Sequence, residues 1–327
     1  MIPDFAKENI DLAQPRLGSK VIYATDDFFA DKARLISPEA PVFIEGKYDD
    51  NGKWMDGWES RRKRVPGHDH CIIRLGRPGV IRGFLIDTSH FTGNYPPFAS
   101  LEACTSDADI PGEEDWRELV PKTALKGDSQ HYVAVKEAGI FTHVRLHIYP
   151  DGGVARLRIY GTINKDWTQV AGDTLINLAA LEEGARPLSC NDQHFGTPEN
   201  MLAPGKGINM GDGWETRRRR EPGHDWAVIA LSHPGVIEKA VIDTAFFKGN
   251  YPDRAFLQAA LITDKTDEQV LAEAENWPVL LPEQKLVADT VHEFTDALAA
   301  IGPVSHVRLN IIPDGGVSRL RLWGRLA

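Results

Sequence analysis

A short polar stretch, DGWESRRKRVPGHD at residues 56–69, combines the residue types that proton transfer and anion binding need. Glu59 and His68 are side chains that can take or give a proton during a reaction. Arg61 and Arg62 carry planar guanidinium groups, which can bind a carboxylate through two parallel hydrogen bonds. This stretch therefore predicts a site that could move protons and hold an anionic group.

The same stretch occurs a second time, as DGWETRRRREPGHD at residues 212–225, with eleven of fourteen positions identical. IDTSHFTGNYP at 86–96 returns as IDTAFFKGNYP at 242–252. HVRLHIYPDGGVARLRIYG at 143–161 returns as HVRLNIIPDGGVSRLRLWG at 306–324. Self-similarity on this scale predicts two copies of one structural unit. We place the domains at 1–165 and 166–327, with the boundary in the polar linker TINKDWTQVAGDTL.

Each copy has the pattern of an all-β domain. Runs such as VIYAT, CIIRLG, GVIRGFLIDT and THVRLHIY are short, rich in β-branched residues, and separated by Gly, Pro, Asn and Asp. Many short strands in about 150 residues favour a sandwich or jelly roll. The best helical stretches are the pieces that start at Ile10 and Ile176, and residues 267–276.

The order of the strands predicts which loops share one end of each sandwich. Successive turns of antiparallel strands lie at alternate ends. If LGRPGV at 75–80 is a turn, the GHD segment before it and the GNYP loop after it lie at the opposite end. We place the PDGG turn of residues 150–153 at that end too, and call this end the rim.

The rim gathers the candidate site residues. We expect Glu59, Glu215, His68 and His224 to transfer protons. The expected substrate-binding residues are Arg61, Arg62, Asp69, Asn94, Asp151, Arg156, Arg217, Arg218, Asp225, Asn250, Asp314 and Arg319. In an extended strand Glu59 and Arg61 share one face. An arginine so close would lower the pKa of Glu59, which suits a base and leaves His68 or His224 as the proton donor.

Each of these features also has a purely structural interpretation. The arginine run could be a solvated face paired with its glutamate, and Trp58 and Trp214 could be packing residues. His68-Asp69-His70 resembles a metal motif, but the second copy has Trp226 in place of His70, so we predict no metal ligands. The loops are the most alike parts of the two copies, which favours a functional rim over packing alone.

Composition narrows the class of partner. The 327 residues carry a net charge of −10, whereas nucleic-acid binding needs a basic surface. No apolar run approaches the 18 residues that a membrane span requires, and the N-terminus has no apolar signal region. The three cysteines, Cys71, Cys104 and Cys190, suggest neither a disulfide framework nor a CxxC metal site. We therefore expect a cytoplasmic protein with no nucleic-acid or membrane partner.

The three repeated motifs, taken together over residues 10–324, resemble those of the allantoicase family. The resemblance implies two tandem jelly-roll β-sandwich domains of the galactose-binding-like, or discoidin-like, type. It implies a hydrolase of purine (allantoin) degradation that acts on C–N bonds of linear amidines, converting allantoate and water to ureidoglycolate and urea. We expect no cofactor. The chemistry would allow a divalent metal such as Mn²⁺, but the sequence does not indicate one. We also expect a homo-oligomer.

The alternative is a non-catalytic pair of lectin-like modules that bind a carbohydrate or another small ligand at the same rim. Such modules favour exposed aromatic platforms over clusters of Glu, Arg and His. Urea release from allantoate would distinguish the two. The site could use one rim, both rims or a cleft between the copies. The first copy alone has His70 and His90, which favours the first rim.

Overall fold

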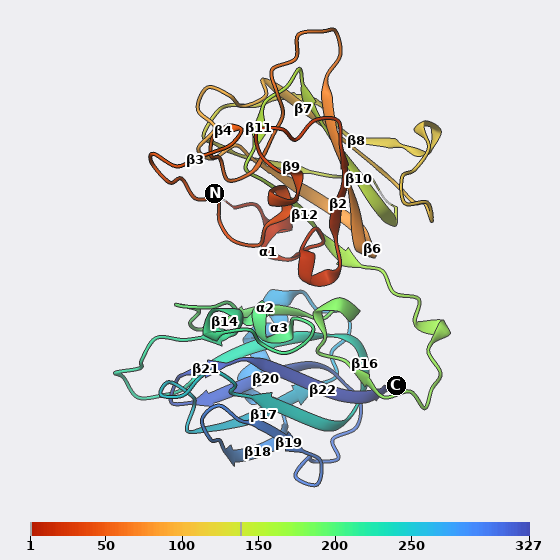
Figure 1. Ribbon diagram of the computed structural model, residues 1–327. Helices are drawn as coiled ribbons and strands as arrows, with labels where there is room; N and C mark the ends of the chain where they lie inside the picture. Colours follow the sequence, from red (N-terminus) through yellow and green to blue (C-terminus); the bar gives the residue numbers. More distant parts are fainter. Residues whose placement is uncertain (1, 138) are drawn as a thin grey trace. The chain divides into compact units, whose positions relative to one another are not determined.

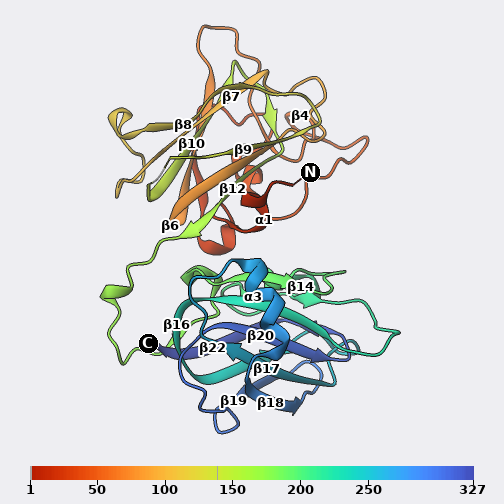
Figure 2. The same cartoon turned by 180° about the vertical axis from the view of Figure 1, so that it is seen from behind.

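The computed structural model describes residues 2–137 and 139–327, and it divides the chain into two compact units, Met1–Asn164 and Lys165–Ala327. Both units are built mainly of antiparallel strands, as Figures 1 and 2 show from opposite sides. No helix of the described residues is long and apolar enough to cross a membrane. The two units have the same strand order.

In the first unit one long strand, β6 (Asp69–Asp87), belongs to both layers of a sandwich. Its first half pairs with β2 (Lys20–Ala24) and β10 (Phe141–Tyr149). Its second half pairs with β9 (Gln130–Ala134) and β12 (Arg156–Ile163). The change of partner falls in LGRPGV. The turn expected there is wrong, because β6 runs through these residues without a break as it passes from one layer to the other.

The remaining strands complete the two layers. β7 (Phe98–Cys104) and β8 (Arg117–Ala124) extend the layer of β10, and β1 (Ile10–Asp11) extends the layer of β12. This arrangement is the jelly-roll sandwich that the sequence predicts. Its core is apolar and closed to solvent. Fully buried side chains come from both layers: Ile73, Leu101, Leu146, Phe84, Ile86 and Leu157.

The second unit repeats this arrangement. The long strand β16 (Asp225–Asp243) pairs in its first half with β14 (Arg186–Cys190) and β20 (Val304–Ile312). Its second half pairs with β19 (Val291–Phe294) and β22 (Arg319–Leu326). β17 (Arg254–Ala260), β18 (Val279–Lys285) and β13 (Ile176–Asn177) complete the layers. The two copies of the sequence repeat therefore have the same strand topology.

Helices are few and short. α3 (Asp267–Glu273), followed by a 3-10 turn at Ala274–Asn276, matches the expected helical stretch, and a capping box at Thr266 and Gln269 starts it. The expected helices at Ile10 and Ile176 are wrong, because both positions begin two-residue strands instead. α1 (Asp4–Lys7) and α2 (Pro198–Leu202) are the other α-helices among the residues described.

Candidate active site

Three loops meet at the rim of the first unit, as the strand order predicts. The Gly153 N–H donates to the Asn94 carbonyl at 2.7 Å, and the Asp69 N–H donates to the Pro150 carbonyl at 3.1 Å. Gly152 has φ +134°, and a Cβ there would lie 2.7 Å from the Asn94 carbonyl oxygen. Only glycine allows this approach, which locks the PDGG turn against the GNYP loop.

Glu59 lies at the centre of this rim. It ends β5 (Trp58–Glu59), which pairs with β11 (Gly153–Val154) on one side and bridges to Ala30 on the other. The side chain is buried, at 9% exposure, and its Oε1 accepts a hydrogen bond of 2.7 Å from Asn94 Nδ2. A backbone held on both sides leaves the carboxylate little freedom of position.

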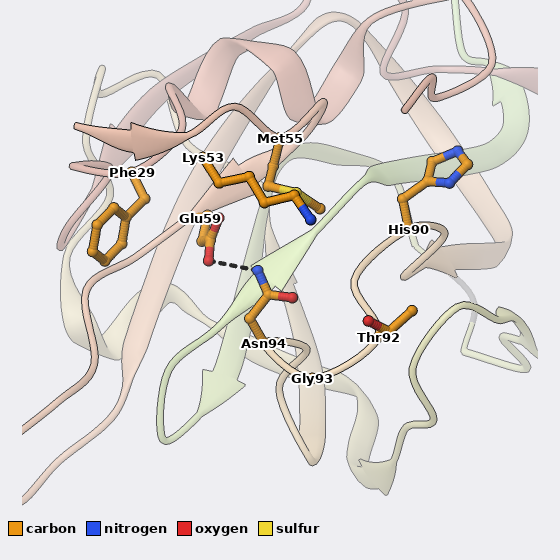
Figure 3. Close-up of a pocket in the computed structure, with 8 residues that line it drawn as sticks. All are labelled: Phe29, Lys53, Met55, Glu59, His90, Thr92, Gly93 and Asn94. Atoms are coloured by element: carbon orange, nitrogen blue, oxygen red, sulfur yellow. Dashed lines mark hydrogen bonds between the residues drawn. The ribbon is translucent and has the colours of Figure 1, made fainter. Parts of the chain in front are cut away.

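A cavity of about 350 Å³ opens beside this carboxylate. Figure 3 shows the Glu59–Asn94 pair on one side and the Lys53 side chain reaching into the same opening. The cavity is lined by Phe29, Lys53, Met55, Glu59, His90, Thr92, Gly93 and Asn94. A mixed lining with a few convergent polar groups is typical of a small-molecule site.

Burial raises the pKa of Glu59, and the Asn94 hydrogen bond and the charge of Lys53 only partly offset this effect. The prediction that a neighbouring arginine lowers the pKa of Glu59 is therefore wrong. The Arg61 guanidinium pairs instead with Asp26, at 2.7 Å from Nε to Oδ2. The carboxylate is accordingly a stronger base than an exposed glutamate.

The arginines lie on a separate part of each rim. Arg61 binds Asp26 through its side chain and its backbone N–H, and Arg217 is 3.6 Å from Asp192 in the second unit. Arg62 and Arg218 are exposed, and neither has a hydrogen bond or ion pair with the residues that the structure describes. In the second unit the arginines line a cavity of about 360 Å³, together with Asn191, Asp192, Glu221 and Asp225; the arginines are Arg217, Arg218, Arg219 and Arg220.

Arg156 and Arg319 do not lie where the substrate-binding prediction needs them. Arg156 is 2% exposed and donates to the Glu39, Asp56 and Ala155 carbonyls and to the Asp56 carboxylate. Arg319 is equally buried and holds Asp212 in the same way. With their donors occupied inside the protein, we assign these two residues to the scaffold and correct the prediction.

The four predicted aspartates form hydrogen bonds that hold the arginine run in place. Asp69 is buried and accepts from the Thr25 hydroxyl and from Lys63 Nζ, and Asp225 accepts at 2.8 Å from Arg219. The Asp151 and Asp314 carboxylates each accept a backbone N–H of the run, from residues 63 and 219, at 2.8 Å. These contacts hold the loop and place none of the four in the Glu59 cavity.

The second unit has only part of the Glu59 arrangement. Asn250 donates to Glu215 as Asn94 does to Glu59, but Met210 Sδ lies 3.9 Å from Asn250 Nδ2. Phe246 replaces His90. The two predicted histidines lie elsewhere on the rims: the His68 Nε2 contacts His147 Nδ1 at 2.9 Å, and His224 Nε2 contacts Asn310 Oδ1 at 3.0 Å.

Comparison with known proteins identifies the repeat. The family model described as the allantoicase repeat matches residues 10–164 and again 176–327. A probable allantoicase 2 of Burkholderia pseudomallei (strain K96243) is 58% identical over 326 residues, covering 99% of this chain and 97% of the relative. A crystal structure of allantoicase from Saccharomyces cerevisiae is 38% identical and superposes with a TM-score of 0.81, covering 97% of this chain and 93% of that one. The chain belongs to the allantoicase family.

Sequence reasoning missed four of the residues that shape the cavity of this family member: Phe29, Lys53, Met55 and Thr92. The available signal was the insertion of about ten residues between Ile36 and Asp56, which the second copy lacks. That insertion carries Lys53 and Met55 to the rim. No group of three or more His, Cys, Asp or Glu side chains suited to a metal ion occurs within residues 2–137 and 139–327.

Proposed function

We propose that the chain hydrolyses allantoate to ureidoglycolate and urea, and that the reaction takes place in the cavity beside Glu59. Family membership supports the reaction. The observation that supports the place is a buried carboxylate of raised pKa, held by an asparagine, in a cavity that also contains a cation. Perturbed carboxyl groups in concave sites are typical of proton-transfer catalysis.

Allantoate is a carboxylate whose central carbon bears two ureido groups. We propose that the Lys53 ammonium binds the carboxylate, because it is the cation that lines the cavity among the described residues. Asn94 donates through Nδ2 to Glu59, which leaves its Oδ1 as an acceptor for a ureido N–H. The exposed Arg62 and Arg218 remain candidates for guiding an anion to the rim.

In the proposed first step Glu59 removes a proton from the nitrogen of the ureido group that stays. The N–H electron pair forms a C=N bond, the C–N bond to the other ureido group breaks, and the departing nitrogen takes that proton from Glu59 to give urea. In the second step water adds to the C=N carbon while the ionised Glu59 accepts a water proton and then delivers it to the nitrogen of the former C=N bond. The sum is allantoate plus water to ureidoglycolate plus urea.

One carboxylate can serve both steps only if it releases its proton as readily as it takes one. A pKa raised toward neutral pH meets this requirement better than that of an exposed glutamate. We propose that the reaction needs no nucleotide or redox cofactor, because acid–base chemistry is sufficient for it. We also propose cytoplasmic residence, in keeping with the three free cysteines.

The test is urea release by the purified chain with allantoate as substrate. We expect one urea per ureidoglycolate, at a rate that neither a chelator nor added Mn²⁺ changes. Absence of urea under both conditions, together with saturable binding of a sugar at the rim, would favour the pair of lectin-like binding modules instead. Rates that appear only with added Mn²⁺ would overturn the metal-free proposal but not the reaction.

A further inference from the structure

Each unit carries one histidine at the same place on its rim, outside the cavity of Glu59. His68 and His224 are half-buried and precede the buried aspartates that start β6 and β16. Each ring forms one hydrogen bond through Nε2. Among the residues described, the other ring nitrogen, Nδ1, has no partner in either unit. Which nitrogen carries the proton decides whether the ring offers a donor or an acceptor.

In the first unit a chain of hydrogen bonds determines which ring nitrogen of His68 carries the proton. His68 Nε2 meets His147 Nδ1, and His147 Nε2 meets Glu102 Oε2, both at 2.9 Å. Burial would raise the pKa of Glu102, but the hydrogen bonds from His147 and Arg145 outweigh it and lower that pKa. The ionised Glu102 can only accept. Burial lowers the pKa of His147, which favours its neutral ring. A neutral His147 that donates from Nε2 accepts at Nδ1, which makes His68 Nε2 the donor.

In the second unit different residues lead to the same result. His224 Nε2 meets Asn310 Oδ1 at 3.0 Å, and Asn310 Nδ2 donates to Gln258 Oε1 at 3.1 Å. Gln258 Nε2 in turn donates to the carbonyls of residues 275 and 277, at 2.8 and 3.0 Å. Backbone carbonyls only accept, so the orientation of both amides is fixed. His224 must again donate from Nε2.

We propose that these two networks are built to leave Nδ1 of His68 and His224 unprotonated, as an acceptor for a ureido N–H of allantoate held at each rim, outside the cavity of Glu59. The inference rests on the proposed function for the identity of that donor. His147 and Glu102 in one unit, and Asn310 and Gln258 in the other, are positioning residues. If these residues only packed, side chains of similar volume would be enough. Instead, both partners of the histidine differ in chemistry between the two units, and yet each hydrogen bond runs in the same direction in both.

The surroundings of His68 keep the ring neutral. Burial, and then repulsion from His147, lowers the pKa of His68, and the charges of Lys63 and Lys122 act in the same direction. Only Asp69 opposes them, and it already binds Lys63. The ring of Tyr149 covers His68, with centroids 4.3 Å apart. A neutral ring with a fixed tautomer suits an acceptor role.

The direct test is the tautomer of each ring in the full chain, read from ¹⁵N chemical shifts of histidine-labelled protein. His68→Asn and His224→Asn assign the signals. We expect both rings in the Nε2–H form at neutral pH. An Nδ1–H form in either ring would overturn the proposal. This measurement needs no substrate, so it tests the network even if allantoate proves not to be hydrolysed.

Glu102→Leu removes the acceptor at the end of the first network. We expect a detectable Nδ1–H fraction at His68 and an increase in the KM for allantoate of roughly 3- to 10-fold, the value of one hydrogen bond. The double variant Glu102→Gln/His147→Asn installs the residues of the second unit and should restore the Nε2–H form and most of the KM. Glu118→Leu, on the exposed face of the neighbouring strand, is the control for adding a leucine. A shifted tautomer with an unchanged KM would overturn the binding role.

Discussion

Glu59 is a carboxylate that the fold holds out of water, with one fixed hydrogen bond from Asn94 and one cation, Lys53, in its cavity. Removing water from a carboxylate disfavours its charged form. The raised pKa follows from that, and not from any nearby acid. Such a group can act as a base at neutral pH and return its proton within the same reaction cycle.

The pH dependence of the reaction follows from this shift. The base is active when ionised, so activity is present above the pKa of Glu59 and is lost as the pH falls through it. We expect the acidic limb of kcat/KM to lie above about 4.3, the value for an unperturbed glutamate. A limb at or below that value in a pH–rate profile would contradict the role of a desolvated base.

The same shift predicts an effect on stability. The folded-state pKa of Glu59 exceeds the unfolded one, so its contribution to stability is present below the unfolded pKa and is lost as the pH rises through the folded pKa. Glu59→Gln keeps an acceptor for Asn94 and removes the buried charge. We expect its Tm at pH 7 to equal or exceed that of the wild type, with the difference shrinking toward pH 4. A lower Tm at pH 7 would indicate that Glu59 is a structural residue.

Replacing Lys53 tests whether this residue binds the substrate carboxylate. Lys53→Met keeps the length of the side chain but removes the charge that we assign to the substrate carboxylate. We expect the KM for allantoate to rise about 10- to 100-fold, since hydrogen bonds to charged groups contribute about 1.5–3 kcal/mol. Lys47→Met, on the same inserted loop and stacked on Trp54, is the matched control. Equal effects of the two variants would place the anion elsewhere.

At the level of elements, the inserted segment between Ile36 and Asp56 turns a shared rim into a cavity in the first unit. Arg156 fastens this segment through the Glu39 carbonyl and Asp56. His90 contacts it as well, with Nε2 donating to the Pro41 carbonyl at 3.1 Å. The segment therefore owes its position to residues on the sandwich.

Arg156→Met and its counterpart Arg319→Met should separate stability from activity. Each leaves a partly buried aspartate without its partner, so we expect each to lower the free energy of unfolding by about 3–5 kcal/mol. Assayed well below their Tm, only Arg156→Met should raise the KM, because it alone loosens the segment that carries Lys53. A similar loss of activity in both variants would argue that the two rims contribute equally.

The elements themselves were largely predictable, and the cavity was not. Alternation of apolar residues, repeated loops and the order of turns led to the jelly roll and to the meeting of GHD, GNYP and PDGG. The pairing of Arg61 with Asp26 instead of Glu59 could not be predicted, because it depends on a bridge between Ala30 and Glu59 from distant parts of the chain. The burial of Arg156 could not be predicted either, because the alternating pattern of a strand does not reveal which of its two faces another segment covers.

At the scale of the whole molecule, duplication produced two rims that have since diverged. Both keep the Glu–Asn pair and a rim histidine. In the first unit this pair lines a cavity together with Lys53 and His90, whereas the second unit has Phe246 in place of His90. This difference favours the first rim as the place of catalysis. The expectation of a homo-oligomer stays a prediction.

The measurement that tests this account most directly is kcat for allantoate in Glu59→Gln and in Glu215→Gln, each made alone and each shown to be folded. Loss of a positioned base costs about 10²- to 10⁴-fold. We predict a loss of that size in Glu59→Gln and a kcat within a few-fold of the wild type in Glu215→Gln. A near wild-type kcat in Glu59→Gln, or the larger loss in Glu215→Gln, would contradict the account.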